Sequence, residues 1–432
     1  MKPGTRAKRA GAMNYAQCLT YLEKLGDEVM TMKFGLETIR ALLETLGNPH
    51  LKYPSVLIGG TNGKGSVARF LNSVCTACEI RNGLYTSPHL IRVEERFVVD
   101  QGPIDSERFA HHLTRVVDAI EGLERSFHPT YFETLTAVAF LYFLEQKVEL
   151  AILEVGMGGR LDSTHVVDPL LAILTPVGLD HQRFLGDTME EVAFEKAGIL
   201  DRAKFALMAP QRSQVQRVFR SEASKNKVEL QELDSGAIQC SESSDGKYAF
   251  RFHEMEFQLP LYGQHQVENA ALAIQAAEVL GQSGFSLSTS CMRKGIEETC
   301  WMGRIQVFGT DPRIVLDGAH NLDAAHALVK FLDRHTQAPR ALLFAMMSDK
   351  DIASVLKILE AAFERFYLTR VNSRRAASIE ELKKLCPSGI AVEDSSAAYR
   401  QALASPVATV VVAGSFYLVG EILRNLSRQA GS

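Results

Sequence analysis

The residues best suited to chemistry form one glycine-rich segment, Gly60-Thr61-Asn62-Gly63-Lys64-Gly65-Ser66. Glycines permit positive φ angles and let backbone N–H groups approach an anion closely. The segment follows an apolar run and precedes an amphipathic one, so a helix N-terminus with its partial positive charge should face the same point. Lys64 can then reach the outer phosphates of a nucleotide, and the Ser66 hydroxyl can face a magnesium ion. The alternative is a strand-to-helix turn without a ligand, but Lys64 and Ser66 together favour phosphate binding.

A carboxylate follows a second expected strand. Glu154 lies at the end of the apolar run Leu150–Val155. The carboxyl end of a parallel strand, beside a phosphate loop, is where an enzyme of this kind places a metal ligand. The glycines that come next do not fit the G-x-G-x-x-G spacing of a dinucleotide site, which disfavours an oxidoreductase.

Three further groups occupy comparable positions. Asp180 and His181 come just beyond the expected strand Leu170–Thr175, and Lys196 stands near the end of a helical segment. In the second half, the string from Asp317 to Asn321 follows a strand and opens a helix, which indicates a second polar site at a sheet edge. The alternatives are a histidine satisfied by backbone groups and a solvated helix lysine.

These residues must be positioned by alternating strands and helices, the pattern of parallel sheets covered by helices. The expected strands are Ser55–Gly59, Leu150–Val155, Leu170–Thr175, Phe205–Ala209, Arg313–Asp317, Ala341–Phe344 and Ala408–Ala413. The expected helices include Ser106–Ile120, Glu133–Leu144, Met189–Ile199, Asn269–Leu280, Asn321–Arg334 and Ala376–Leu385. Residues 228–260 break the alternation and predict a small antiparallel element. A boundary near 298–303 would divide the chain into domains of residues 1–298 and 299–432.

Composition limits the partners. The chain has 432 residues, and its 47 basic and 51 acidic residues give a net charge of −4, so no nucleic-acid partner is expected. Apolar residues make up 46% of the chain, but no apolar run approaches the ~18 residues that span a bilayer. We therefore expect a soluble protein with no membrane partner. Residues Met1–Ala12 have no apolar core typical of a secretory signal, and we expect a disordered tail there.

The seven cysteines are scattered along the chain and odd in number, which is typical of a reducing compartment and favours a cytoplasmic location. Cys75 and Cys78 form a lone C-x-x-C with no second pair at zinc-site spacing. We therefore favour free thiols at both positions over a zinc or redox site.

The ordered series of motifs resembles the Mur ligase superfamily, and more narrowly its folylpolyglutamate synthase and dihydrofolate synthase branch. The resemblance begins at the phosphate loop and runs in order through most of the chain. The further matching strings are Thr86–Leu90, Tyr131–Glu133, Glu154–Asp162, Leu179–His181, Glu195–Ile199, Gly303-Arg304, Asp317–Asn321, Asp349–Asp351 and Gly414–Tyr417.

The resemblance implies an ATP-dependent enzyme that joins a folate-type carboxylate to the amino group of L-glutamate. The acid would be dihydropteroate, tetrahydrofolate or both. A carboxylate is a poor electrophile, whereas an acyl phosphate can be attacked by an amine, so catalysis consists mainly of positioning groups and neutralising anionic oxygens. The resemblance also implies an ATP- and pterin-binding domain, a Rossmann-like glutamate-binding domain and a cleft between them. We expect a monomer, and a monovalent cation is left open.

By resemblance, Gly60, Thr61, Asn62, Gly63, Lys64, Gly65 and Ser66 hold the ATP phosphates. Ser87 and Glu154, with the Ser66 hydroxyl, would bind one magnesium ion, and His181 a second. Lys196 matches a lysine that the family carries as a carbamate, an anion that can support the second metal. Lys64, Lys196 and His181 are thus the expected catalytic residues.

The remaining contacts are also implied by resemblance. Asn269 and Asp317 would bind the adenosine, and Arg304 the phosphates. His320 and Ser415 would hold glutamate, while Thr130, Tyr131, Phe132, Glu133 and Arg160 would contact the pterin substrate. Structural alternatives are helix caps at Asn269, Asp317 or Asn321, an interdomain salt bridge for Arg304, and ordinary aromatic core packing for residues 130–133.

Some features depart from the family pattern. His165 stands where an asparagine is usual, near the expected site, and Met302 and Leu322 replace common prolines. The proline losses should only loosen the local backbone. Two other functions stay open: a related amide ligase acting on peptidoglycan precursors, and a regulatory protein that hydrolyses ATP without ligation. The folate-type strings argue against the first, and retention of Arg304, His320 and Ser415 against the second.

Overall fold

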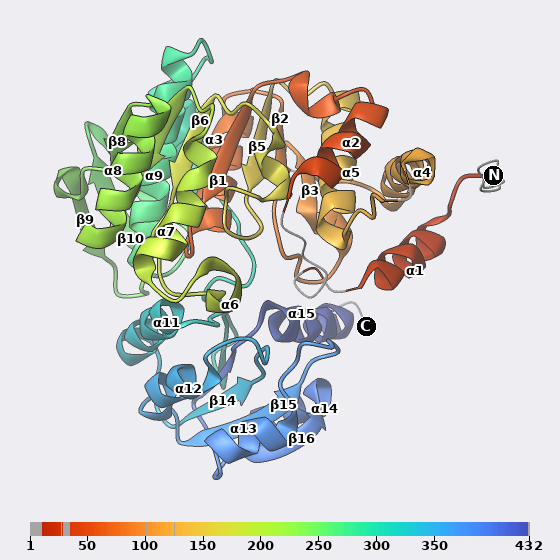
Figure 1. The fold of residues 1–432 in the computed structure, drawn as a ribbon. Helices are drawn as coiled ribbons and strands as arrows, with labels where there is room; N and C mark the ends of the chain where they lie inside the picture. Colours follow the sequence, from red (N-terminus) through yellow and green to blue (C-terminus); the bar gives the residue numbers. More distant parts are fainter. Residues whose placement is uncertain (1–10, 27, 29–34, 101, 125, 431–432) are drawn as a thin grey trace.

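The computed structural model describes residues 11–26, 28, 35–100, 102–124 and 126–430. The expectations for Met1–Ala12, a disordered tail without a secretory signal, therefore lie almost entirely outside the described residues. Two units are evident, each built on one large sheet (Figure 1). We refer to them as the N-terminal unit and the C-terminal unit.

The N-terminal unit contains a sheet of eight strands. Their order is β4 (Gly102–Pro103), β3 (Phe97–Val99), β2 (Asn82–Tyr85), β5 (Leu150–Glu154), β1 (Ser55–Gly59), β6 (Leu171–Leu174), β7 (Phe205–Met208) and β8 (Leu230–Glu232). The pairs β2–β3 and β3–β4 are antiparallel, and the other neighbouring strands of this sheet are parallel. The central strands are buried on both faces, which explains their continuous apolar sequences. Along β1, Leu57 joins one core and Val56 and Ile58 join the other, because successive strand residues face opposite sides.

Helices cover both faces of this sheet. On one face lie α3 (Lys64–Ala77), α9 (His265–Gln282) and α10 (Thr289–Glu297). On the other face lie α1 (Tyr15–Leu25), α2 (Glu37–Thr45), α4 (Ser106–Gly122), α5 (Tyr131–Glu145), α7 (Met189–Ala197) and α8 (Ser213–Asn226). The expected antiparallel element is present as β9 (Ile238–Glu242), β10 (Tyr248–Phe252) and β11 (Met255–Leu259).

The C-terminal unit is a smaller Rossmann-like layer structure. Its strand order is β12 (Gln306–Phe308), β13 (Arg313–Leu316), β17 (Thr409–Ala413), β14 (Arg340–Phe344), β15 (Arg365–Arg370) and β16 (Ile390–Asp394), and only β12 is antiparallel. One face carries α11 (Leu322–His335), α12 (Ile352–Glu360) and α13 (Ile379–Leu385); the other carries α14 (Ser395–Leu403) and α15 (Phe416–Ala430). The predicted fold class, two α/β units with parallel-dominated sheets, is confirmed.

Helix starts differ from the predictions where capping decides them. α5 begins at Tyr131 because the Thr130 hydroxyl and the Glu133 carboxylate form a reciprocal capping box. α13 begins at Ile379, later than expected, because Ser378 caps it in the same way. α9 begins at His265, four residues before Asn269. Asn269 is thus an interior residue, and the alternative that it caps this helix is wrong.

Cys78 is not a free thiol. It forms a disulfide with Cys291, and this bond ties the C-terminal end of α3 to α10. The two residues are 213 positions apart in sequence, so spacing gave no signal, and it is the packing of α3 against α10 that brings their Cα atoms to 5.0 Å. Cys18, Cys75, Cys240, Cys300 and Cys386 remain free, so the prediction for Cys75 is confirmed.

The disulfide predicts a thiol count and a stability effect. Non-reduced protein unfolded in denaturant should expose five reactive thiols, and seven after reduction. Reduction should lower the free energy of unfolding by about 2–4 kcal/mol, because the bond restricts the unfolded chain. Denaturant titration measures this loss, and Cys300→Ser, at an exposed free cysteine, should leave stability unchanged. Seven reactive thiols without reductant would show that the bond is absent.

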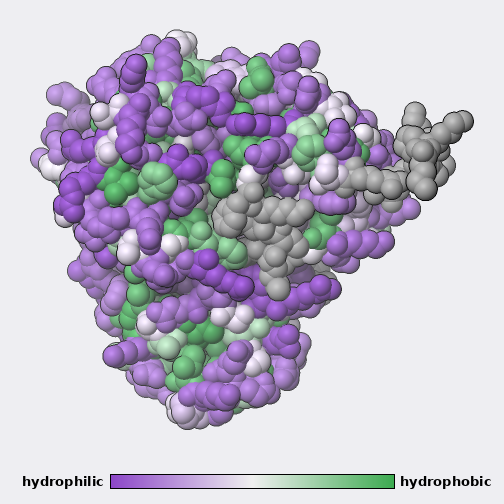
Figure 2. Space-filling model, viewed as in Figure 1, coloured by the Kyte–Doolittle hydropathy of each residue, from purple (hydrophilic) through white to green (hydrophobic). Residues whose placement is uncertain are grey.

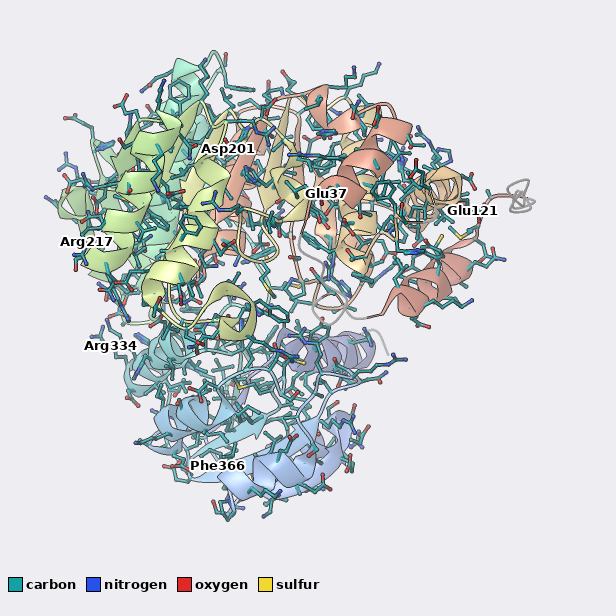
Figure 3. All side chains as sticks on the ribbon, in the orientation of Figure 1. Glu37, Glu121, Asp201, Arg217, Arg334 and Phe366 are labelled. Carbon is teal, nitrogen blue, oxygen red and sulfur yellow. A yellow bond between two sulfur atoms is a disulfide. The ribbon has the colours of Figure 1, made fainter. Side chains whose placement is uncertain are left out.

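Polar contacts join the two units. Glu242 of β9 accepts a hydrogen bond from Arg334 (Nη1–Oε2, 2.9 Å), and its carboxylate also lies beside the His335 ring. Arg334 lies where α11 meets the N-terminal unit (Figure 3). On the opposite side, Arg424 of α15 donates to the Ile91 carbonyl at 2.9 Å. Gly420 of the same helix lies so close to the Leu90 carbonyl that no side chain would fit there.

The visible surface is mostly hydrophilic, with scattered hydrophobic patches (Figure 2). Within the described ranges of the chain, no helix has both the length and the apolar character required to cross a membrane.

Candidate active site

A cavity lies where the two units meet. Its wall from the N-terminal unit comes from the phosphate loop after β1, from Glu154 at the end of β5, and from the stretch after β6 that contains Asp180 and His181. Arg304, His320, Lys350 and Ser415 of the C-terminal unit complete it. Ligands of parallel α/β sheets bind at the carboxyl ends of the strands, so both sheets deliver polar groups to one place.

The phosphate loop adopts the expected strand–loop–helix geometry. Gly60 and Gly63 have φ angles of 141° and 88°, and a side chain at Gly63 would collide with the Asn269 amide. Lys64 begins α3, and its Nζ donates to the Gly60 and Thr61 carbonyls at 3.1 and 3.3 Å. Burial lowers the pKa of Lys64, and the nearby Glu154 opposes that shift. The amine is thus folded over a loop whose N–H groups can face an anion.

Glu154 is a buried carboxylate at the floor of the cavity. One of its oxygens accepts the Ser87 N–H at 3.0 Å, and the start of α3 at Gly65 lies against it. Burial raises the pKa of Glu154, while the charge of Lys64 and the Ser87 hydrogen bond counter this rise. The structure brings Glu154, Ser87 and Lys64 together, as the sequence predicted.

Asp180 gathers cationic and imidazole groups from both units. Lys350 donates to it at 2.5 Å, and the Nε2 atoms of His181 and His320 lie 3.9 and 3.8 Å from it. Burial raises the pKa of Asp180, but its neighbours outweigh burial and hold that pKa well below its usual range. Burial also lowers the pKa of His181 to about 3 and of His320 to about 4. At neutral pH both rings are uncharged, and Lys350 is the cation that pairs with Asp180.

His181 has a feature of a metal ligand. Its φ angle of 53° is unusual for a residue with a side chain, and such strain concentrates at functional sites. Its Nδ1 atom is buried and has no hydrogen-bond partner. A neutral imidazole with an unpaired nitrogen in a polar cavity can accept a cation.

Lys196 is buried rather than solvated, so the alternative of a surface lysine is wrong. Its Nζ donates to the Gly60 carbonyl at 2.7 Å, and no carboxylate of the described chain lies within ion-pair distance of it. Burial, followed by the charge of Lys64, lowers its pKa to about 7. The Gly60 carbonyl thus accepts hydrogen bonds from the amines of both Lys64 and Lys196.

A second cavity adjoins the first across Asn62, Gly63, Arg304 and His320. It contains Asn269 and Asp317, the residues expected to bind adenosine, and also Ser66. Asp317 accepts the N–H groups of Ile305 and Ala319, both at 2.8 Å, so it organises its loop and does not cap α11. Asn321 is the residue that caps α11.

Arg304 forms no salt bridge with any residue of the described chain, so that alternative is wrong. Its guanidinium lies 4.2 Å from the centre of the Phe416 ring, and its buried Nε has no hydrogen-bond partner. Burial lowers the pKa of Arg304, although Asp317 and Glu154 attract its charge. An unpaired guanidinium between two cavities is well placed to receive an anionic ligand.

A third cavity adjoins the first on its other side and shares Phe132, Met157, Gly158 and Glu28 with it. Thr130 and Glu133 line it, but they also form the capping box of α5. Tyr131 lines neither cavity; its ring lies beside the Arg96 guanidinium. The aromatic wall on this side is therefore Phe132, which packs on Tyr85.

The structure does not bring Arg160, Ser66 or His165 to the cavity that contains Glu154. Arg160 points to α8 and α7, where it donates to Glu222 at 2.9 Å and covers the Phe194 ring. Ser66 faces the cavity of Asn269 and not that of Ser87. His165 is buried against the Arg160 carbonyl, with a Nδ1–O distance of 3.0 Å, and lines none of the three cavities.

Sequence reasoning missed several cavity residues. Lys350 was noted only within a matching string, although it pairs with Asp180 from the other unit. Glu28 lies between the first and third cavities, held by the buried Arg96 at 2.8 Å. Its position far upstream of every motif left no local signal.

The fold and the cavity define a ligase-type α/β protein of two units. Residues 58–277 match the family model of the Mur ligase middle domain, and residues 303–416 match that of the Mur ligase glutamate ligase domain. The dihydrofolate synthase/folylpolyglutamate synthase of Escherichia coli is 32% identical over 96% of both chains, and that of Bacillus subtilis 33% identical over 81% of this chain and 84% of its own.

Solved structures agree with these matches. A Mycobacterium tuberculosis folylpolyglutamate synthase complexed with ADP and AMPPCP superimposes with a TM-score of 0.86 at 30% identity, covering 96% of this chain and 99% of that one. E. coli FolC in complex with DHPP and ADP also gives 0.86, at 31% identity over 97% and 99%. The chain belongs to the Mur ligase family, in its dihydrofolate synthase/folylpolyglutamate synthase branch. The resemblance read from the sequence, and the prediction of a ligase, are confirmed.

Proposed function

We propose that this chain joins L-glutamate to the carboxylate of a folate-type acid with the use of ATP. The observation that carries the proposal is the single cavity in which a lysine-bearing phosphate loop, a buried carboxylate and His320 and Ser415 of the second unit meet. The relatives support the choice of substrates, since the E. coli structure contains DHPP and ADP. Both dihydropteroate and a reduced folate are proposed as acceptors, as in the names of the bifunctional relatives.

The three adjoining cavities suggest how the substrates are arranged. We assign the nucleoside to the cavity of Asn269 and Asp317, the phosphates to the loop, and the flat heterocycle to the cavity of Phe132. The acid oxygen attacks the γ-phosphoryl group, ADP leaves, and an acyl phosphate forms. The glutamate amine then attacks the acyl carbon, and inorganic phosphate leaves with that acid oxygen. Lys64 and Arg304 neutralise the anionic oxygens that gather during these steps.

The donor set fits magnesium. Glu154 and Ser87 offer oxygen ligands of the kind that Mg²⁺ prefers. The unpaired buried nitrogen of His181 is a less common magnesium ligand, and we assign it to a second ion. Bound magnesium would supply charge neutralisation on the nucleotide phosphates. Because Ser66 faces the adjoining cavity, we propose Ser87 and Glu154 as the main ligands of the first ion.

We also propose that Lys196 carries a carbamate. Two buried amines, Lys64 and Lys196, share one carbonyl, and no carboxylate within ion-pair distance balances Lys196. Carbamylation requires an uncharged amine, and the lowered pKa of Lys196, about 7, supplies it at neutral pH. The product is an anion, which would balance Lys64 and support a cation at His181.

The assignment of ATP and pterin to residues 1–298 and of glutamate to residues 299–432 is part of the proposal. Arg304 and Asp317 add contacts from the C-terminal unit to the nucleotide cavity. The monomeric state and a cytoplasmic location stay predictions, and a monovalent cation stays open.

The test uses purified full-length protein with ATP, Mg²⁺ and glutamate, offered dihydropteroate or a tetrahydrofolate in turn. Product masses should increase by one glutamate, and ADP release should require both the acid and glutamate. With ¹⁸O in the acid, the label should appear in the released phosphate. ADP release without glutamate would indicate an ATPase instead, and activity only with a UDP-sugar peptide would indicate a peptidoglycan-type ligase.

A further inference from the structure

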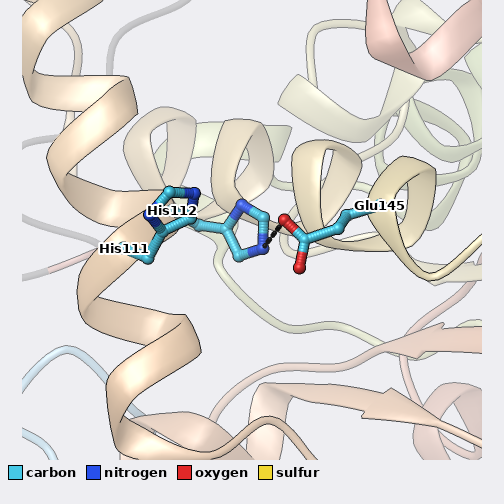
Figure 4. Close-up of side chains that lie close together, drawn as sticks. All are labelled: His111, His112 and Glu145. Atoms are coloured by element: carbon cyan, nitrogen blue, oxygen red, sulfur yellow. Dashed lines mark ion pairs between the residues drawn. The ribbon is translucent and has the colours of Figure 1, made fainter.

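Two helices bring three metal-ligating side chains together away from the active site. His111 and His112 are adjacent on α4, and Glu145 is the last residue of α5 (Figure 4). One ligand atom from each lies within 4.8 Å of the other two. α5 starts beside the third cavity and runs 15 residues, so Glu145 lies about 21 Å along the helix from that cavity.

His112 is the unusual member of this cluster. Its side chain is fully buried, yet neither ring nitrogen has a hydrogen-bond partner. Its Nε2 lies 3.3 Å from Glu145 Oε2, although the geometry is not that of a hydrogen bond. Buried polar atoms are rarely left unpaired, because desolvation without a partner is unfavourable. No group of the described residues completes a hydrogen bond to the ring nitrogen beside Glu145, so a bound metal ion can serve as its partner.

The spacing of His112 and Glu145 fits two ligands of one metal ion. Two ligands of a tetrahedral zinc ion are about 3.3 Å apart, since each bond is about 2.0–2.1 Å. The Nε2–Oε2 distance matches this separation without adjustment.

His111 can complete the set. It is exposed, and its ring lies 5.3 Å from that of His112, centre to centre. An exposed side chain can shift by the roughly 1.5 Å that would bring its nitrogen to ligand spacing. Two imidazoles and a carboxylate suit Zn²⁺ and neighbouring transition metals, whereas Mg²⁺ prefers oxygen ligands alone.

We propose that His111, His112 and Glu145 bind one divalent transition-metal ion of the zinc type, separate from the active site. The ion links α4 to the end of α5 and gives the buried His112 the partner that it lacks. None of the three cavities of the active site includes these residues. The ion therefore stabilises the N-terminal unit and takes no part in ligation.

The test compares zinc binding by metal-stripped full-length protein and the variant His111→Gln/Glu145→Gln. Both residues are exposed, so the variant should fold, which circular dichroism verifies. Equilibrium dialysis should give one more zinc per chain for the wild type than for the variant. The matched control is His326→Gln/Glu360→Gln, which changes an exposed histidine and an exposed glutamate that also ends its helix. It should bind zinc as the wild type does.

Zinc should also raise the melting temperature of the wild type and of the control by a few degrees more than that of the variant. X-ray absorption of the extra zinc should show nitrogen and oxygen neighbours. Equal zinc stoichiometry in the wild type and in the double variant would overturn the proposal. Sulfur neighbours, which would place the ion at a cysteine, would overturn it as well. Neither result would affect the proposed ligase function.

Discussion

Replacing Lys64 with alanine should lower kcat for ligation roughly 10³-fold or more. Lys64 starts the helix behind the phosphate loop, its amine folds over the Gly60 and Thr61 carbonyls, and Glu154 lies nearby. Removing a positioned cation from a phosphoryl-transfer site typically costs this much, because the remaining groups neutralise the charge that develops on the transferring oxygens less completely. Steady-state ADP release with each folate-type acid measures the loss.

A matched control separates chemistry from folding. Lys52→Ala removes an exposed lysine just before β1 and should leave kcat unchanged. Lys64→Met, which keeps most of the side-chain volume, should be as inactive as Lys64→Ala while its melting temperature stays close to that of the wild type. A Lys64→Ala enzyme within tenfold of the wild type would contradict the assigned role.

Lys196→Met should combine lost activity with increased stability at neutral pH. We expect kcat to fall about 10²-fold or more, because the variant can neither carry a carbamate nor donate to the Gly60 carbonyl. The stability effect follows from the pKa of Lys196, about 7 in the folded protein against an ordinary 10.5. Between these values the unfolded chain binds a proton that the folded protein does not, so wild-type stability falls as the pH falls.

The gap in unfolding free energy between Lys196→Met and the wild type should therefore be small near pH 10.5. It should grow to a few kcal/mol near pH 7 in CO₂-free buffer. Adding bicarbonate should narrow that gap and raise wild-type activity, since the carbamate replaces a buried amine. Lys204→Met, at an exposed lysine, serves as the control and should show neither effect. A stability gap that does not change with pH would exclude the lowered pKa as its cause.

Local sequence patterns predicted the strands and the phosphate loop well, because these depend on neighbouring residues. The run Ser55–Gly59 forms a buried strand, and Gly60 and Gly63 after it take the positive φ angles of the turn. Glu154 was located by the same logic of strand ends. The α5 start at Tyr131 was shifted only because Thr130 and Glu133 cap each other.

The features that the sequence did not predict depend on contacts between segments that are far apart in the chain. The Cys78–Cys291 bond and the pairing of Lys350 with Asp180 each join segments more than 150 residues apart. Arg160 lies within a matching string, yet its contacts with Phe194 and Glu222 hold its guanidinium away from the cavity. Side-chain direction of this kind depends on partners that no local pattern records.

The contribution of both sheets to one cavity has an evolutionary consequence. In the proposed function, activation of the acid relies on the N-terminal unit together with Arg304 and Asp317, whereas the wall assigned to the amine carries His320 and Ser415. Substitutions around His320 and Ser415 can change which amino compound is accepted, while the residues assigned to ATP and to activation of the acid stay unchanged. Because the two units divide the work in this way, a few substitutions confined to the C-terminal unit can give rise to new amide products.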